Sequence, residues 1–88
     1  MIPIGENEKA YVLESKSGGI CLCRALSGRY YEFTPDRAID LAIWVKEIAP
    51  EDRDNWVARE VDDAGLEDGW RRLEEIWKNA RKKNVGSG

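Results

Sequence analysis

The chain has 88 residues, 42% hydrophobic and 35% charged, with a net charge of −3, which suits one compact domain over residues 1–88 and excludes a disordered chain. Histidine is absent, which removes the usual general base near neutral pH and every Ser-His or Cys-His nucleophile pair, so we expect no enzyme. The longest apolar run, residues 41–45, is too short to cross a bilayer, and the N-terminus lacks a secretory signal pattern, so we expect a cytoplasmic protein without membrane contact.

The first part of the chain shows the alternation typical of short β-strands. After an irregular lead over residues 1–8, the pattern predicts three strands, at 9–14, 19–26 and 29–33. The connections are short, and the second is a two-residue Ser27-Gly28 link of the kind that favours a tight hairpin. Consecutive strands are therefore expected to be antiparallel neighbours.

The predicted turns also set the register of this sheet. Counting outward from them puts Leu13 opposite Ile20 and Tyr11 opposite Leu22. The apolar face then holds Tyr11, Leu13, Ile20, Leu22 and Phe33, with Tyr31 beside them. The reverse face, which is mixed and expected to be exposed, holds Val12, Cys21, Cys23, Ala25, Tyr30 and Glu32.

The two cysteines lie two residues apart on one predicted strand. Their side chains share a face, and this geometry disfavours a disulfide between Cys21 and Cys23. A zinc site needs about four ligands, and without histidine the chain has too few of the right type. We therefore expect reduced thiols, no metal and no cofactor.

Three helices are predicted after the strands. Thr34 can cap the free amides of the first helix, Pro35 suits its first turn, and Asp36 favours the positive end of the helix dipole. Its apolar arc is too wide for a surface helix, so we expect it to run to about residue 48 as the central helix on the sheet.

Pro50 ends that helix, and a second one is predicted over 51–64, with Gly65 as its left-handed end. A third is predicted over 68–83, because its apolar residues are spaced by three and four: Trp70, Leu73, Ile76, Trp77 and Ala80. Residues 84–88 are expected to form a flexible tail. The predicted fold is α+β, a three-stranded antiparallel sheet (βββ) followed by three helices packed on one sheet face.

Charge is unevenly distributed over the predicted helices. Residues 51–68 carry eight acids and two arginines, a local net charge of −6, whereas residues 69–88 carry six bases and two acids, a local net charge of +4. The simplest interpretation is that each charged set is the solvated face of its helix. A second interpretation is that the acidic set attracts a protein partner, for example by imitating a phosphate backbone in a basic groove.

All four tryptophans fall in the predicted helical part, and large aromatics often anchor protein interfaces. Helix periodicity assigns Trp44 and Trp70 to the core and leaves Trp56 and Trp77 partly exposed. Our leading hypothesis is a small acidic regulator or inhibitor that binds another protein, of the type that a mobile element or phage encodes. The expected contact residues are Trp56, Glu60, Asp62, Asp63 and Trp77.

Two alternatives use the third predicted helix. In one, the protein binds nucleic acid, with Tyr30 stacking on a base and phosphate contacts from Arg71, Arg72, Lys78, Arg81, Lys82 and Lys83, although the net charge of −3 opposes this. In the other, the protein is a homodimer in which two third helices pair antiparallel and set basic ends against acidic ones. No motif of a named family is present.

Overall fold

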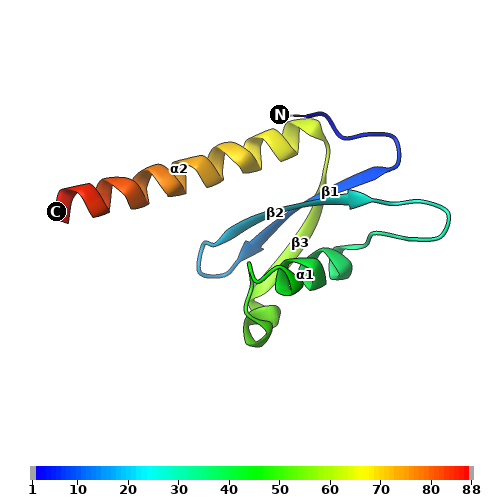
Figure 1. The fold of residues 1–88 in the computed structure, drawn as a ribbon, viewed down its shortest axis with the longest axis horizontal. Coiled ribbons are helices and arrows are strands. Elements are labelled where there is room, and N and C mark those ends of the chain that lie inside the picture. The colour runs from blue at the N-terminus through cyan, green and yellow to red at the C-terminus, as the bar shows by residue number, and fades with distance from the viewer. Residues whose placement is uncertain (1, 88) are drawn as a thin grey trace.

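The computed structural model describes the backbone of residues 2–87 and the side chains of residues 2–80. Along the chain the elements are β1 (Glu8–Ser15), β2 (Ile20–Leu26), α1 (Pro35–Trp44), the 3-10 helix η1 (Pro50–Asn55), β3 (Trp56–Val61) and α2 (Asp63–Ser87). The strands form one antiparallel sheet in the order β2-β1-β3 (Figure 1). The α+β class, with a three-stranded antiparallel sheet and three helices, is confirmed. The order along the chain is ββααβα, so the predicted order βββααα is wrong.

The third strand is β3, in the segment predicted as the second helix. Trp56, Ala58 and Val61 are half-buried and Val57 is exposed, which is closer to strand alternation than to a helical stripe. The cause lies in β1, where Ala10, Tyr11, Val12 and Leu13 are all buried. Such a continuous apolar run is typical of a central strand with a partner on each side and cover on each face.

Residues 29–33, predicted as the third strand, form a loop instead. The amide of Gly28 donates to the carbonyl oxygen of Tyr31 at 2.7 Å, so the chain turns at Arg29 and Tyr30 and does not continue as a strand. Phe33 then enters the core, where its carbonyl oxygen accepts a hydrogen bond from the Tyr11 hydroxyl at 3.1 Å.

The register between β1 and β2 differs from the prediction by one residue. Leu13 pairs with Cys21 and Tyr11 with Cys23. The turn contains one more residue than expected, with Gly18 at φ +94°, where the Gly18 amide donates to Ser15 and the Ser15 amide to Gly19. A shift of one residue exchanges the faces of a strand, so both cysteines join the face predicted for Ile20 and Leu22.

Helices cover both faces of the sheet, which corrects the predicted packing on one face (Figure 1). On one face α1 packs over the main core, which contains Tyr11, Leu13, Cys21, Cys23, Phe33, Ala38, Ile39, Ala42 and Ile48. On the other face α2 approaches closely at Gly69, where an added Cβ would lie 2.9 Å from the side chains of both Leu22 and Val12. Both sheet faces are apolar, and each therefore needs a covering element.

The helix ends show which local signals were decisive. α1 begins as predicted, with Thr34 Oγ1 accepting from the amide of Arg37 at 3.3 Å, but it ends at Trp44. α2 begins after Asp62, whose Oδ1 accepts from the amide of Gly65 at 2.9 Å. Gly65 therefore lies in the first turn of α2, and the prediction that it ends a helix is wrong. α2 continues to Ser87 and projects beyond the sheet, including most of the predicted tail (Figure 1).

None of the described helices is long and apolar enough to span a membrane.

Candidate interaction groove at the edge of the sheet

A groove of about 580 Å³ runs along β2 between the two covering helices. It is lined by five consecutive strand residues: Ile20, Cys21, Leu22, Cys23 and Arg24. Consecutive side chains of a strand point to opposite faces, so a cavity that touches all five must follow the edge of the strand. The rest of the lining comes from α1 (Leu41, Ala42, Val45), from Glu47 after it, and from α2 (Trp70, Leu73, Trp77).

The backbone of β2 is open toward this groove. β2 is an edge strand. Just beyond its two ends, the Ser15 amide donates to the carbonyl oxygen of Gly19 and the Ser27 amide donates to that of Asn7, so Gly19 and Ser27 belong to hydrogen-bonded pairs with the β1 side. Bonded and non-bonded pairs alternate in an antiparallel ladder, so Ile20, Leu22 and Arg24 direct their N–H and C=O groups outward. Among the described residues, no backbone hydrogen bond from a turn or loop uses these groups.

The wall formed by α2 is aromatic. The rings of Trp70 and Trp77 lie edge to face, with centroids 5.8 Å apart, and the two residues are 40% and 51% exposed. On the opposite wall, Val45 of the α1 end is half-exposed. Water therefore reaches large apolar side chains on both sides of an open strand edge, which is typical of a surface that binds another polypeptide.

A second hollow of about 740 Å³ adjoins the groove on the α2 side and shares Leu22, Arg24 and Trp70 with it. Its outer rim is charged, with Arg71 donating to Glu67 at 3.0 Å and Glu74 beyond them. Apolar side chains thus lie next to the sheet, and charged ones lie along the flank of α2 that faces outward from β2.

Arg24 does not make the groove an anion site, because its guanidinium is already occupied. It donates to Glu8 Oε1 at 2.6 Å and to the carbonyl oxygens of Ile2 and Pro3 at 2.7 and 3.0 Å. The hydrogen bond from Arg24 holds the pKa of Glu8 below its ordinary value, with a smaller contribution from the Gly5 amide. Arg24 therefore ties the N-terminal lead to β2.

Two of the four tryptophans, Trp44 and Trp70, are exposed although the sequence predicted them to be in the core. Trp44 is 79% exposed, whereas Ala38 and Ala42 of the same helix are buried, so the Trp44 side chain lies on the side of α1 away from the core. Trp70 is 40% exposed, so it too is not a core residue. Trp77 is exposed as expected, and Trp56 is half-buried against the main core and beside Gly19. The groove brings together Trp70 and Trp77 but neither Trp44 nor Trp56.

The acidic residues do not form one helical face. Glu51, Asp52 and Asp54 lie in η1 before β3, whereas Asp62 and Asp63 follow its other end. Glu60 is exposed on β3 opposite Tyr11. Asp62 caps α2, and Asp63 Oδ1 accepts from the amide of Ile4 at 2.6 Å. The two aspartates thus have structural partners, and β3 separates them from the acids of η1.

The residues of the nucleic-acid alternative are also dispersed. Arg71 and Arg72 form ion pairs with Glu67 and Glu14, and Lys78 is exposed. The side chains of Arg81, Lys82 and Lys83 lie outside the described residues. Tyr30 is 92% exposed on the loop after β2, at the end of the sheet away from the projecting part of α2 (Figure 1).

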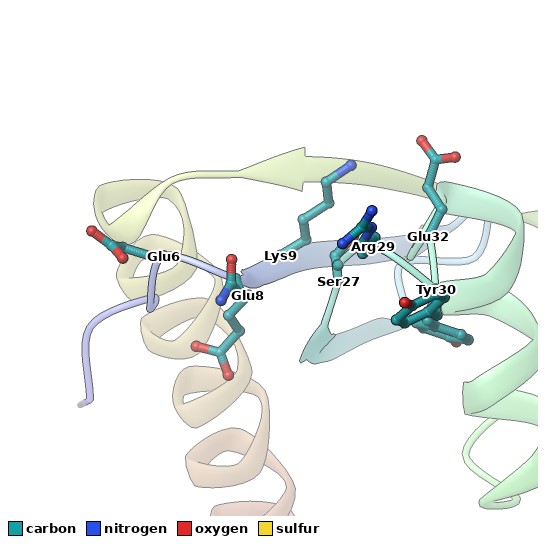
Figure 2. Close-up of a pocket in the computed structure, with 10 residues that line it drawn as sticks. Glu6, Glu8, Lys9, Ser27, Arg29, Tyr30 and Glu32 are labelled. Carbon is teal, nitrogen blue, oxygen red and sulfur yellow. The ribbon is translucent and has the colours of Figure 1, made fainter.

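That loop borders a shallow pocket of about 440 Å³ whose polar side chains do not converge. In Figure 2, Glu8 and Lys9 point in opposite directions, and Tyr30 lies beside Arg29, whose Cζ is 5.9 Å from the ring centroid. A small-molecule site is normally concave, mostly apolar and supplied with converging polar groups. This pocket has no such arrangement.

The cysteines are reduced, as expected, but both are buried, so the prediction that their sheet face is exposed is wrong. Burial raises the pKa of Cys21 to about 11, with smaller contributions from Glu47 and Cys23, and burial also raises the pKa of Cys23. Protonated thiols are poor nucleophiles and poor metal ligands. Within the part of the chain whose side chains are described, no group of three or more His, Cys, Asp or Glu residues is arranged to hold a metal.

Comparison of the chain with protein-family models, with curated proteins and with solved structures finds no significant match.

Proposed function

We propose that this chain is a non-enzymatic protein-association module and that the groove along β2 is its contact surface. The observation that supports this proposal is the combination, in one groove, of outward backbone groups from β2 with the exposed rings of Trp70 and Trp77. Open strand edges bind extended chains through the backbone, and aromatic residues beside them contribute binding energy.

On this proposal the protein acts by occupying the surface of another polypeptide, as an accessory protein, regulator or inhibitor in the cytoplasm does. The groove offers apolar contact area and backbone hydrogen bonds, and neither requires a catalytic group. The acids outside the groove then serve mainly to cap elements and to influence the approach of a partner through long-range charge.

A capture experiment with a groove variant and a matched aromatic control tests the proposal. The groove variant is Trp77→Glu, and the control is Tyr30→Glu, which places the same charge on a fully exposed aromatic position outside the groove. Tagged wild type and both variants are incubated with an extract of the cells that make this protein. An untagged copy of the chain is added as a further candidate for capture.

We expect wild type and Tyr30→Glu to retain the same polypeptide, and Trp77→Glu to retain at least about tenfold less, because a charge in the apolar wall costs more than about 1.4 kcal/mol of binding. Circular dichroism establishes that both variants are folded. Equal capture by a folded Trp77→Glu variant would show that the groove is not the contact surface.

A further inference from the structure

We infer that the polypeptide that fills the groove is a second copy of this chain, paired antiparallel through β2 so that two three-stranded sheets become one continuous sheet. This inference rests on the proposed function, because it identifies the partner of the same groove. It differs from a dimer formed by helices alone in requiring backbone hydrogen bonds between the two β2 strands.

The two edges of the sheet differ in their protection. Natural proteins protect an exposed edge with charged residues, proline, bulges or a covering element. The outer edge strand β3 carries Arg59 and Glu60 side by side, and acids flank it. β2, with the sequence ICLCRAL, has no lysine or proline, and its single charge, Arg24, is bound to Glu8 and the N-terminal lead. β2 is therefore the edge that requires a cover.

The position of α2 allows a second copy to fit. An added Cβ at Gly69 would overlap both Val12 and Leu22, so at that point α2 lies over the space between β1 and β2. A two-fold axis midway between paired β2 strands, which are spaced by ~4.8 Å, places the two α2 axes ~10 Å apart. Packed helices lie about 8–10 Å apart, so the continuous sheet brings the two α2 helices into contact.

The direction of α2 makes this helix pair antiparallel. Along α2, Leu66 lies near Arg24, Gly69 near Leu22, and Arg72 near Glu14, which is the partner of Ile20. α2 thus runs along β2 in the opposite direction. A two-fold axis that pairs β2 with β2 of the second copy must therefore also place the two α2 helices side by side and antiparallel.

The charges on the outward flank of α2 are complementary to themselves in this arrangement. In chain order they are Glu67, Arg71, Glu74 and Lys78, an alternation of negative and positive. Reversing the helix turns this series into positive, negative, positive, negative. An antiparallel mate therefore sets Glu67 against Lys78 of the second copy and Arg71 against its Glu74, so that every facing pair has opposite charges.

This pairing also predicts the register of the strands. Its centre lies between Arg72 and Leu73, ~5 Å along the helix from Gly69, which corresponds to ~1.5 strand residues from Leu22 toward Ile20. The two-fold axis then passes close to Cys21. Ile20 faces Leu22 of the second copy, and the outward amides and carbonyls of these two residues can bond to each other.

A charge-exchange experiment tests the arrangement. Glu67→Lys with Glu74→Lys makes the flank wholly positive, and Arg71→Glu with Lys78→Glu makes it wholly negative. The mass of each protein is measured by sedimentation equilibrium from micromolar to millimolar concentration. We expect wild type to be a dimer, each charge variant to be a monomer, and their equimolar mixture to form a heterodimer with an affinity within about tenfold of wild type.

A matched control comes from the solvent side of the same helix. Asp68→Lys with Glu75→Lys changes the net charge of α2 by the same amount at two exposed acids outside the flank, and it is expected to remain a dimer. Loss of the dimer in this control as well would show that net charge, and not pairing along the flank, controls association.

Hydrogen exchange of individual amides reports on the strands. In the wild-type dimer the amides of Ile20 and Leu22 are expected to exchange at least about tenfold more slowly than in either charge variant alone. A dimer with equally fast exchange at these amides pairs through helices only and overturns the inference. A monomer at millimolar concentration also overturns it and leaves the groove to an unlike partner, which the capture experiment detects separately.

Discussion

At the scale of single residues, two glycines are linked to the register of β2 and to the packing of α2 on the sheet. Gly18, at φ +94°, lies in a first turn that has one more residue than predicted, and the resulting register brings Cys21 and Cys23 into the main core. Gly69 lets α2 approach β1 and β2 until no side chain fits between them. The sequence predicted a turn containing Gly18, but only the pairing of the strands shows where that turn starts and ends.

The close approach at Gly69 leads to a first prediction. Gly69→Val is expected to lower the free energy of unfolding by about 2 kcal/mol or more, because added carbon atoms overlap Leu22 and Val12 and force the helix outward. Denaturation by urea measures the change. Ala64→Val, at an exposed position of the same helix, is the control and is expected to cost no more than about 0.7 kcal/mol.

The buried thiol of Cys21 leads to a second prediction, which concerns pH. Its pKa is raised from 9.0 to about 11 in the folded protein, so folding favours the protonated form. The resulting stabilisation is complete below pH 9 and is lost as the pH rises through 9 toward 11. Burial also raises the pKa of Tyr11, and this shift favours the folded protein in the same direction.

Urea denaturation across this pH range, compared between wild type and Cys21→Ala, isolates the contribution of the thiol. The alanine variant is expected to be less stable below pH 9 because of the smaller side chain, and to lose less stability between pH 9 and pH 11. Parallel pH curves for the two proteins would contradict the assignment.

At the scale of elements, the segment that forms β3 fits the sequence pattern of a helix as well as that of a strand. Trp56, Val57 and Val61 suit one side of a short helix as well as a strand, and the acids around them favoured the helix. β1 decides between the two, because its buried central run needs a second hydrogen-bonded neighbour and β3 supplies it. Short apolar segments are ambiguous in this way until their partners are known.

The start of α2 leads to a third prediction, which separates a structural role of Asp62 from a role in binding. Asp62→Ala removes the acceptor of the Gly65 amide and is expected to cost about 1 kcal/mol of stability. Asp62→Asn keeps a cap and is expected to cost little. Thermal or urea denaturation gives both values, and both variants should retain the captured partner. Loss of capture in a stable Asp62→Asn protein would instead support the acidic-surface hypothesis.

At the scale of the whole molecule, the structure separates the charged groups that the sequence placed together. The acids lie before, on and after β3, and α2 projects from the end of the sheet opposite the loop after β2 (Figure 1). Within residues 2–80, whose side chains the structure describes, two of the three basic residues of α2, Arg71 and Arg72, are held in ion pairs. Three exposed apolar residues, by contrast, lie along one edge of the sheet: Val45, directly after α1, and Trp70 and Trp77 of α2.

A fourth prediction follows from this dispersal of charge. In a gel-shift assay at low ionic strength, where phosphate contacts are strongest, the protein is expected not to bind single- or double-stranded DNA or RNA. The ion pairs of Arg71 and Arg72 and the net charge of −3 both oppose binding. A shift that weakens steeply with added salt would revive the nucleic-acid alternative.

The sequence by itself determined the α+β class, the first two strands, the start of α1 at Thr34 and the apolar stripe of α2, because these depend on local periodicity and on caps. The register of β2, the strand at Trp56–Val61 and the exposure of Trp44 and Trp70 were decided only by the tertiary structure. These features depend on contacts between distant residues, which no local pattern contains. The groove along β2 belongs to this second group, since it exists only where α1, α2 and an unpaired strand edge meet.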